Sequence, residues 1–258
     1  MLSFTVRLRF HGDLPFFLRS RLGPTLAIEK VLRERTSVKD VIESCGVPHP
    51  EVDLILVNDE PVEFAQALMI ESEIDVFPVP APPELFPASR LQQRCIRRFV
   101  ADGHLGKLAR DLRLLGIDVH YENQANDTQL LAMISSGDCA LLTRDRRLLM
   151  HAIVRHGYCP RSAEHEEQTV EVVKRFDLAE AIAPHTRCLR CNGVLARVEK
   201  SEILDRLEPL TRLYYEDFRR CLECAKIYWR GSHFEKLRSR IERLRPPPSD
   251  FRPLLSDL

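Results

Sequence analysis

The chain has 258 residues, of which 44% are hydrophobic and 29% charged, a composition typical of folded globular proteins that excludes wholesale disorder. Its 38 basic and 38 acidic side chains balance, and no apolar run approaches the roughly 20 residues that span a bilayer. We therefore expect a cytoplasmic protein with no membrane partner. The charge is unevenly spread, because residues 1–80 hold 8 basic against 13 acidic side chains.

The first 80 residues predict a small α+β domain. Residues 4–10 alternate apolar and polar side chains, as a half-buried strand does, and residues 37–42 have helical spacing with Ser37 as the N-cap. Residues 53–58 and 74–77 are typical of strands.

Two stretches of this domain, 57–62 and 71–78, resemble ubiquitin-like β-grasp proteins of the small sulfur-carrier type. Carriers of that family end in Gly-Gly, whereas here the last strand runs into Pro78-Val79-Pro80. The resemblance therefore implies a scaffold or an acidic surface for a protein partner. An adaptor in sulfur transfer is a weaker alternative, since the Gly-Gly end is missing.

Proline marks the boundaries of the chain. Five prolines in residues 78–87 predict a semi-rigid extended linker, which we place at 81–92. A second proline-rich stretch opens a C-terminal tail at 246–258, which we expect to be poorly ordered.

Residues 93–183 alternate strands with helices, which predicts an α/β domain with a parallel sheet covered on both faces. The expected strands are 95–101, 117–121 and 139–143. The expected helices are 105–115, 127–134, 148–156 and 166–176.

Three aspartates fall where such a sheet binds ligands. Asp102 and Asp145 follow two of the expected strands, and Asp127 opens a helix. Ligands bind outside the carboxyl ends of parallel strands. Three carboxylates gathered there would repel one another unless a cation such as Mg²⁺ or Mn²⁺ neutralised them. The structural alternatives are a helix cap at Asp127 and a turn at Asp102.

Basic side chains accompany these aspartates. Lys107, Arg110 and Arg113 recur every three residues after Asp102, and Arg144 directly precedes Asp145. Positive charge in such a place suits contact with nucleic-acid phosphates. A solvated helix face would show the same pattern.

The stretches 99–110 and 141–146 resemble the PIN-domain nucleases, and more narrowly the Mut-seven C-terminal RNase domain, a PIN-like domain joined to a zinc ribbon. The resemblance implies a metal-dependent ribonuclease, with RNA as its partner and with Mg²⁺ or Mn²⁺ held by Asp102, Asp127 and Asp145.

One feature of the PIN pattern is not placed by the sequence. Many PIN nucleases carry a further acid on a helix, and Asp111, Asp118 and Glu122 all remain open for that position. A non-catalytic RNA-binding protein with a degenerate PIN-like domain is therefore the alternative function.

Two Cys-x-x-Cys pairs predict a closed tetrahedral site for structural zinc in a ribbon over 184–245. The four ligands are Cys188, Cys191, Cys221 and Cys224. Beyond them, Trp229 and His233 stand in an aromatic and basic string that is typical of RNA contacts. For Trp229, packing against the nuclease domain is an equal alternative.

Overall fold

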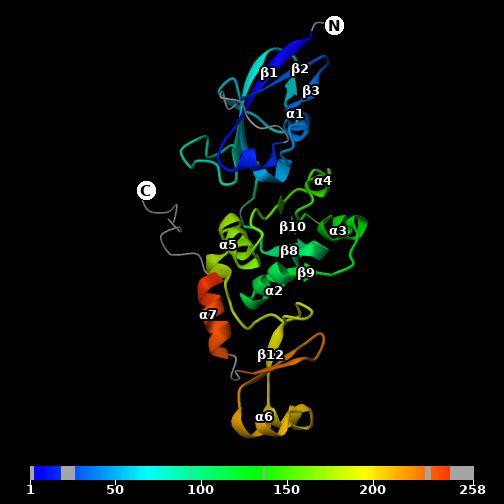
Figure 1. Ribbon diagram of the computed structural model, residues 1–258, viewed down its shortest axis with the longest axis vertical. Helices are drawn as coiled ribbons and strands as arrows, with labels where there is room; N and C mark the ends of the chain where they lie inside the picture. The colour runs from blue at the N-terminus through cyan, green and yellow to red at the C-terminus, as the bar shows by residue number, and fades with distance from the viewer. Residues whose placement is uncertain (1–2, 19–26, 94, 136, 230–233, 245–258) are drawn as a thin grey trace. The chain divides into compact units, whose positions relative to one another are not determined.

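The structure is a computed structural model that describes residues 3–18, 27–93, 95–135, 137–229 and 234–244 (Figure 1). The predicted tail at 246–258 lies outside these residues. The chain divides into two compact units, of which the first holds residues 1–96 and 126–159 and the second residues 97–125 and 160–258. Each unit therefore combines segments that are distant in sequence.

The N-terminal part of the first unit is built on a five-stranded sheet in the order β2-β1-β7-β4-β5 (Figure 1). The central pair is parallel, with Arg9 of β1 opposite Asp75 of β7, while β2 and β4 are antiparallel to it and β5 is antiparallel to β4. Alternation in β1 buries Val6, Leu8 and Phe10, as predicted. The strands are β1 (Phe4–Phe10), β2 (Ala27–Leu32), β4 (Val52–Val57), β5 (Glu60–Pro61) and β7 (Ser72–Pro78).

Short elements complete this domain. Helix α1 (Val38–Ser44) begins at the predicted N-cap, because the Ser37 hydroxyl accepts from the Asp40 N–H at 3.1 Å. Strands β3 (Thr36–Ser37) and β6 (Ala67–Leu68) pair with each other. Two 3₁₀ turns, η1 (Leu14–Phe17) and η2 (His49–Glu51), follow β1 and precede β4, respectively.

The proline-rich segment after β7 folds back onto this domain and is not a free spacer. Ala81 and Leu85 pack against Leu54 and Leu56 of β4. The Asp53 carboxylate accepts from the N–H of Ala81 at 3.0 Å. The expectation of an extended linker is wrong here, because the prolines prevent ladder pairing but not burial of the apolar residues between them.

The central part of the chain has the predicted α/β character, with a parallel sheet flanked by helices. In the second unit, β8 (Arg98–Ala101) is parallel to β9 (Asp118–Tyr121), and α2 (Gly106–Leu114) packs on α5 (His165–Arg175). In the first unit, β10 (Cys139–Leu142) is parallel to β11 (Gly157–Tyr158). Two helices belong to this segment of the first unit, α3 (Asp127–Ile134) and α4 (Arg146–Leu149).

One helix of this region differs from the expectation of residues 148–156. Helix α4 ends at Leu149, and turns lead from there to β11. Asp145 starts the helix two residues earlier than expected. The chain must then return to the sheet at Gly157, whose position leaves no room for a side chain beside Leu149.

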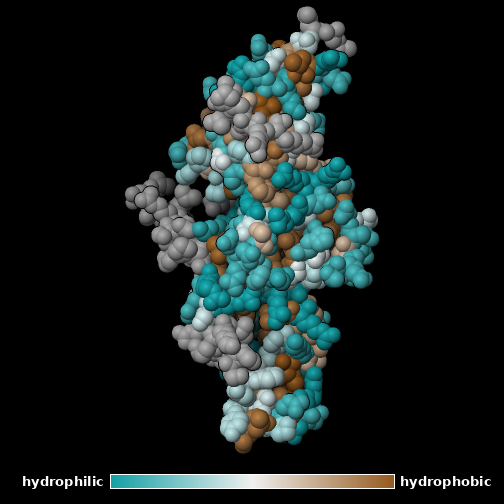
Figure 2. All heavy atoms as spheres, in the orientation of Figure 1, coloured by the Kyte–Doolittle hydropathy of each residue, from teal (hydrophilic) through white to brown (hydrophobic). Residues whose placement is uncertain are grey.

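The C-terminal ribbon is a three-stranded antiparallel sheet. Its strands are β12 (Leu195–Val198), β13 (Phe218–Cys221) and β14 (Ile227–Trp229), and η5 (Lys200–Arg206) and α6 (Pro209–Tyr214) connect the first two. Apolar side chains of α6, including Leu210 and Leu213, lie exposed on this ribbon (Figure 2).

Helix α7 (Phe234–Leu244) was predicted to belong to the ribbon, but it packs against α5. Its Arg240 binds Asp111 of α2 at 2.7 Å. Across the described residues, no helix is both long and apolar enough to cross a membrane.

Candidate functional site

Asp102 directly follows β8, at a corner where two nearby glycines have no room for a side chain. A Cβ on Gly103 would lie 2.7 Å from the carbonyl oxygen of Asn123, and one on Gly106 would lie 2.5 Å from the Tyr121 hydroxyl. That hydroxyl in turn donates to the carbonyl of Gly103 at 3.0 Å. The end of β9 therefore braces the backbone that carries Asp102, as a turn with a fixed side-chain direction requires.

Asp145 is the N-cap of α4. Its Oδ1 accepts from the backbone N–H groups of Arg147 at 2.8 Å and Leu148 at 3.2 Å. Oδ2 has no hydrogen-bond partner among the described residues, and the side chain is exposed. The carboxylate is thus held by one oxygen and presents the other to solvent, which is an arrangement able to bind a cation.

Asp127 lies in the first turn of α3 but does not cap it. The cap is Asn126, which forms a capping box with Gln129. Asp127 is exposed beside it. Because Asp102 belongs to the second unit and Asp127 and Asp145 to the first, a joint metal site of the three aspartates remains a prediction.

Two of the three acids left open for a further ligand have structural partners. Asp111 is 1% exposed and binds His165 Nδ1 at 2.7 Å as well as Arg240. Asp118 accepts from Arg187 at 3.0 Å and from the Asn192 side chain at 2.6 Å. Glu122 is exposed and directly follows Tyr121, which pairs with Ala101, the residue before Asp102.

The basic residues of α2 do not share one role. Lys107 and Arg110 are exposed, but Arg113 is 4% exposed and its guanidinium donates to the carbonyls of Val119 (2.9 Å) and Arg190 (3.1 Å). The predicted RNA contact of Arg113 is therefore wrong. At 3.6 residues per turn, a three-residue spacing drifts by about 60° each time, so the third member of the series lies about 120° away from the first.

Arg144, the remaining predicted basic contact, is exposed next to Asp145. Trp229 is 43% exposed on β14, with its ring tilted against that of Phe218 at 6.5 Å between centroids. The Trp229 side chain is thus partly packed and partly available. His233 lies outside the described residues.

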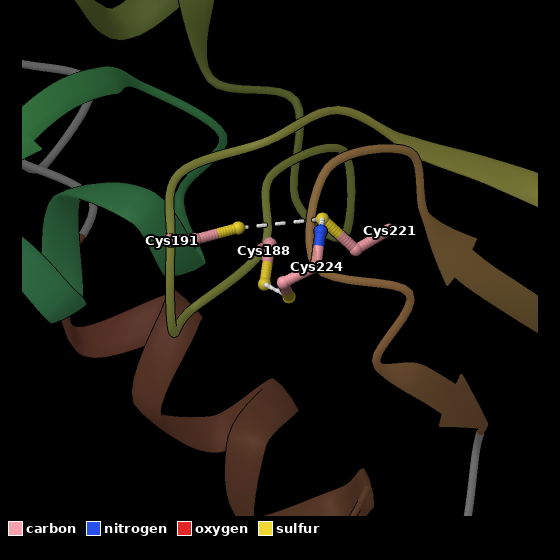
Figure 3. Close-up of side chains that lie close together, drawn as sticks. All are labelled: Cys188, Cys191, Cys221 and Cys224. Carbon is pink, nitrogen blue, oxygen red and sulfur yellow. Dashed lines mark hydrogen bonds between the residues drawn. The ribbon is translucent and has the colours of Figure 1, made fainter.

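The four predicted cysteines form a single cluster (Figure 3). Their sulfur atoms all lie within 4.8 Å of one another, with Cys188 and Cys224 at 3.7 Å and Cys191 and Cys221 at 3.4 Å. Tetrahedral coordination with Zn–S bonds of about 2.3 Å would place sulfurs about 3.8 Å apart. The donor set and the spacing therefore fit a metal ion held by four thiolates.

The acid–base properties of the cluster also favour a cation. Burial alone would raise the pKa of Cys188, but hydrogen bonds from Tyr228 and from backbone N–H groups of Cys191 and Arg190 outweigh it and lower that pKa. Burial and the nearby sulfurs raise the pKa of Cys191. Several thiolates cannot crowd together here unless a positive charge compensates them.

Two residues supporting this cluster were not singled out from the sequence. The Tyr228 hydroxyl lies 3.1 Å from Cys188 Sγ and accepts from the Leu189 N–H at 3.1 Å, so its own proton is available to a Cys188 thiolate. Asn192 accepts from the N–H of Val119 on β9 at 3.1 Å. Asn192 directly follows the first Cys-x-x-Cys pair, and Tyr228 lies on the strand after the second pair. These positions were the signal in the sequence that could have identified both residues.

Two family models match the chain. One described as the Mut7-C RNAse domain matches residues 97–241, and one described as Mut7-C ubiquitin matches residues 3–83. Comparison with curated proteins and with solved structures gave no match.

Proposed function

Because the chain belongs to the Mut7-C RNAse domain family, we propose that it is a metal-dependent ribonuclease hydrolysing RNA phosphodiester bonds. The observation that carries the proposal is the match over residues 97–241, a span that contains all three aspartates. The N-terminal domain matches the ubiquitin-like domain that is described for the same family.

In this proposal Asp102, Asp127 and Asp145 hold Mg²⁺ or Mn²⁺. A divalent cation bound there would polarise the scissile phosphate and lower the pKa of a bound water. Asp145 contributes through Oδ2, since two backbone N–H groups fix Oδ1. Glu122 is the best candidate for the further acid, because it is exposed and follows the strand next to β8.

Contact with the RNA backbone falls to the exposed cations Lys107, Arg110 and Arg144. Half-exposed Trp229 would stack on a base. The four-cysteine cluster holds structural zinc, whose closed ligand set leaves no open position for catalysis.

Cleavage of a panel of structured and single-stranded RNAs, with and without Mn²⁺, tests the function. Asp145→Asn is the sharpest variant, because asparagine is as good an N-cap as aspartate. It keeps α4 intact and removes the charge. We expect Mn²⁺-dependent cleavage by the wild type, a loss of about 10³-fold or more in Asp145→Asn, and an unchanged Tm. Equal cleavage by both proteins would contradict the proposal.

The alternative is a non-catalytic RNA-binding protein. It is favoured by the structural pairing of Asp111 and Asp118, which removes two of three candidates for the further acid. Binding across the panel without cleavage, and affinity unchanged or improved in Asp145→Asn, would support this alternative.

A further inference from the structure

Arg146 directly follows Asp145, yet its guanidinium does not extend into solvent. Nη1 donates to the carbonyl of Phe17 at 2.8 Å and Nη2 to the carbonyl of Phe16 at 3.2 Å. The guanidinium carbon also lies 5.1 Å from the Phe16 ring centroid and 5.2 Å from that of Phe17. Arg146 is therefore clamped by η1, a turn of the ubiquitin-like domain about 130 residues away in sequence.

The ubiquitin-like domain also contacts the chain beyond α4, on both sides of β11. His49 Nε2 lies 2.7 Å from the carbonyl oxygen of Val154, and the Glu51 carboxylate accepts from the N–H of Cys159 at 2.7 Å. Glu51, Val154 and Cys159 are all buried. Separating the two parts would leave these polar groups without their buried partners, so this is not the contact of a loosely tethered module.

The helix that begins at Asp145 needs such support. Helix α4 has only four residues, a length at which a helix is not stable by itself in water. Its start is set by the two hydrogen bonds to Asp145 Oδ1, so the direction of Oδ2 depends on where this single turn is held. The hydrogen bonds of Arg146 join that turn to η1.

We propose that the ubiquitin-like domain is a positioning element of the nuclease, in which η1 holds Arg146 and thereby orients Asp145. This inference rests on the proposed function. Arg146 is a positioning residue and not a catalytic one. The acidic domain is accordingly part of the catalytic unit.

The test compares Arg146→Lys with Arg147→Lys in the full chain. Both variants keep the positive charge, but only Arg146→Lys loses the pair of hydrogen bonds to η1, since Arg147 is exposed and contributes only its backbone to the cap. Phe16→Ala removes one ring of the clamp from the other side, at a residue that is 43% exposed and not in the core. Amide hydrogen exchange at residues 145–149 and steady-state RNA cleavage are measured together, with Tm as a check on folding.

We expect faster exchange at 145–149 in Arg146→Lys and Phe16→Ala, and a kcat about tenfold lower with little change in KM. Arg147→Lys should match the wild type. The effects of Phe16→Ala and Arg146→Lys should not add in the double variant, because both break one clamp. An equal loss through KM alone would indicate RNA contact by Arg146 and overturn the inference.

The two proposals fail in different ways. If the wild type cleaves RNA in an Asp145-dependent manner but exchange and kcat are unchanged in both clamp variants, the ribonuclease stands and the positioning role is wrong. If exchange rises but kcat does not fall, the clamp exists without orienting Asp145, and the inference is again wrong. If the wild type cleaves no RNA, the function fails, and unchanged exchange would refute the clamp as well.

Discussion

Two arginines on one helix show how position on the helix decides the role of a charged residue. Arg110 is exposed on α2, whereas Arg113 is buried and satisfies carbonyls of β9 and of the first Cys-x-x-Cys loop. A buried guanidinium is stable only when its donors find acceptors, and three carbonyls supply them here.

Matched substitutions should separate these roles. Arg110→Gln should weaken RNA binding and reduce the slope of log affinity against log salt by about one, with little change in Tm. Arg113→Gln should lower the free energy of unfolding by about 2–4 kcal/mol, because it leaves buried carbonyls unpaired, and should leave the salt slope unchanged. Fluorescence anisotropy with labelled RNA and chemical denaturation measure the two effects. A reduced salt slope in folded Arg113→Gln would refute the assignment.

Tyr228 is a residue whose importance comes from one hydroxyl. Tyr228→Phe should lower metal affinity about tenfold or more, because the oriented donor to Cys188 is lost. Tyr214→Phe makes the same chemical change at an exposed side chain and is the control. Zinc transfer to a chromogenic chelator gives the affinity of each protein. Equal transfer from both variants would show that the hydroxyl does not support the metal.

At the scale of elements, the parallel pair β1–β7 carries a row of opposite charges on its exposed face. Arg9 binds Asp75 at 2.7 Å and Arg7 binds Glu73 at 2.7 Å across the pair, and His11 Nε2 also contacts Asp75. The Arg9 hydrogen bond is the largest cause of a lowered pKa at Asp75; burial opposes it and the contact with His11 adds to it. The pairing therefore stabilises the ionised form of Asp75 in the folded chain.

This pairing predicts a defined acid response of the N-terminal domain. A lowered folded pKa means that the stabilisation is fully present above the ordinary carboxyl pKa of about 4 and is lost as pH falls through the folded value. Asp75→Asn should therefore flatten the loss of stability below about pH 4. Glu71→Gln, which neutralises an exposed carboxylate before the same strand, should not. Urea unfolding at a series of pH values gives the free energy of unfolding of each protein. An equal fall of this free energy below about pH 4 in the wild type and Asp75→Asn would contradict the prediction.

At the scale of the whole molecule, the four-cysteine cluster and the β8–β9 pair share a boundary within the second unit. The first Cys-x-x-Cys loop supplies Asn192 to the N–H of Val119 and receives Arg113, which also binds the Val119 carbonyl. Side chains thus supply both backbone hydrogen bonds of Val119. A metal that orders the loop consequently supports the sheet as well as the ribbon.

Removal of the metal should therefore affect both parts. A chelator should lower Tm by about 8–16 °C, the shift expected if bound metal contributes about 4 kcal/mol. Hydrogen exchange should rise at residues 118–121 as well as at 186–229. Cys191→Ser should reproduce these changes without a chelator, and Cys95→Ser, at an exposed cysteine outside the cluster, should not. Increased exchange restricted to the ribbon would show that β9 does not depend on the loop.

Several features of this protein were determined by the sequence alone. Alternation in β1, the Ser37 cap, the parallel α/β rhythm and the paired cysteines are local patterns, and local patterns report which groups must be buried, capped or ligated. The four cysteines meet because each Cys-x-x-Cys pair is itself a local turn, and one antiparallel sheet brings the two turns together.

Only the tertiary structure decided the roles of Arg113, Arg146, Tyr228 and the proline-rich segment. Each depends on a partner far away in sequence: the Cys-x-x-Cys loop, η1, Cys188 and β4, respectively. A charged or aromatic side chain carries no local mark of its partner, because burial and hydrogen bonding depend on which surfaces meet after folding. The sequence thus named the candidate chemistry, and packing decided which residues remain available for it.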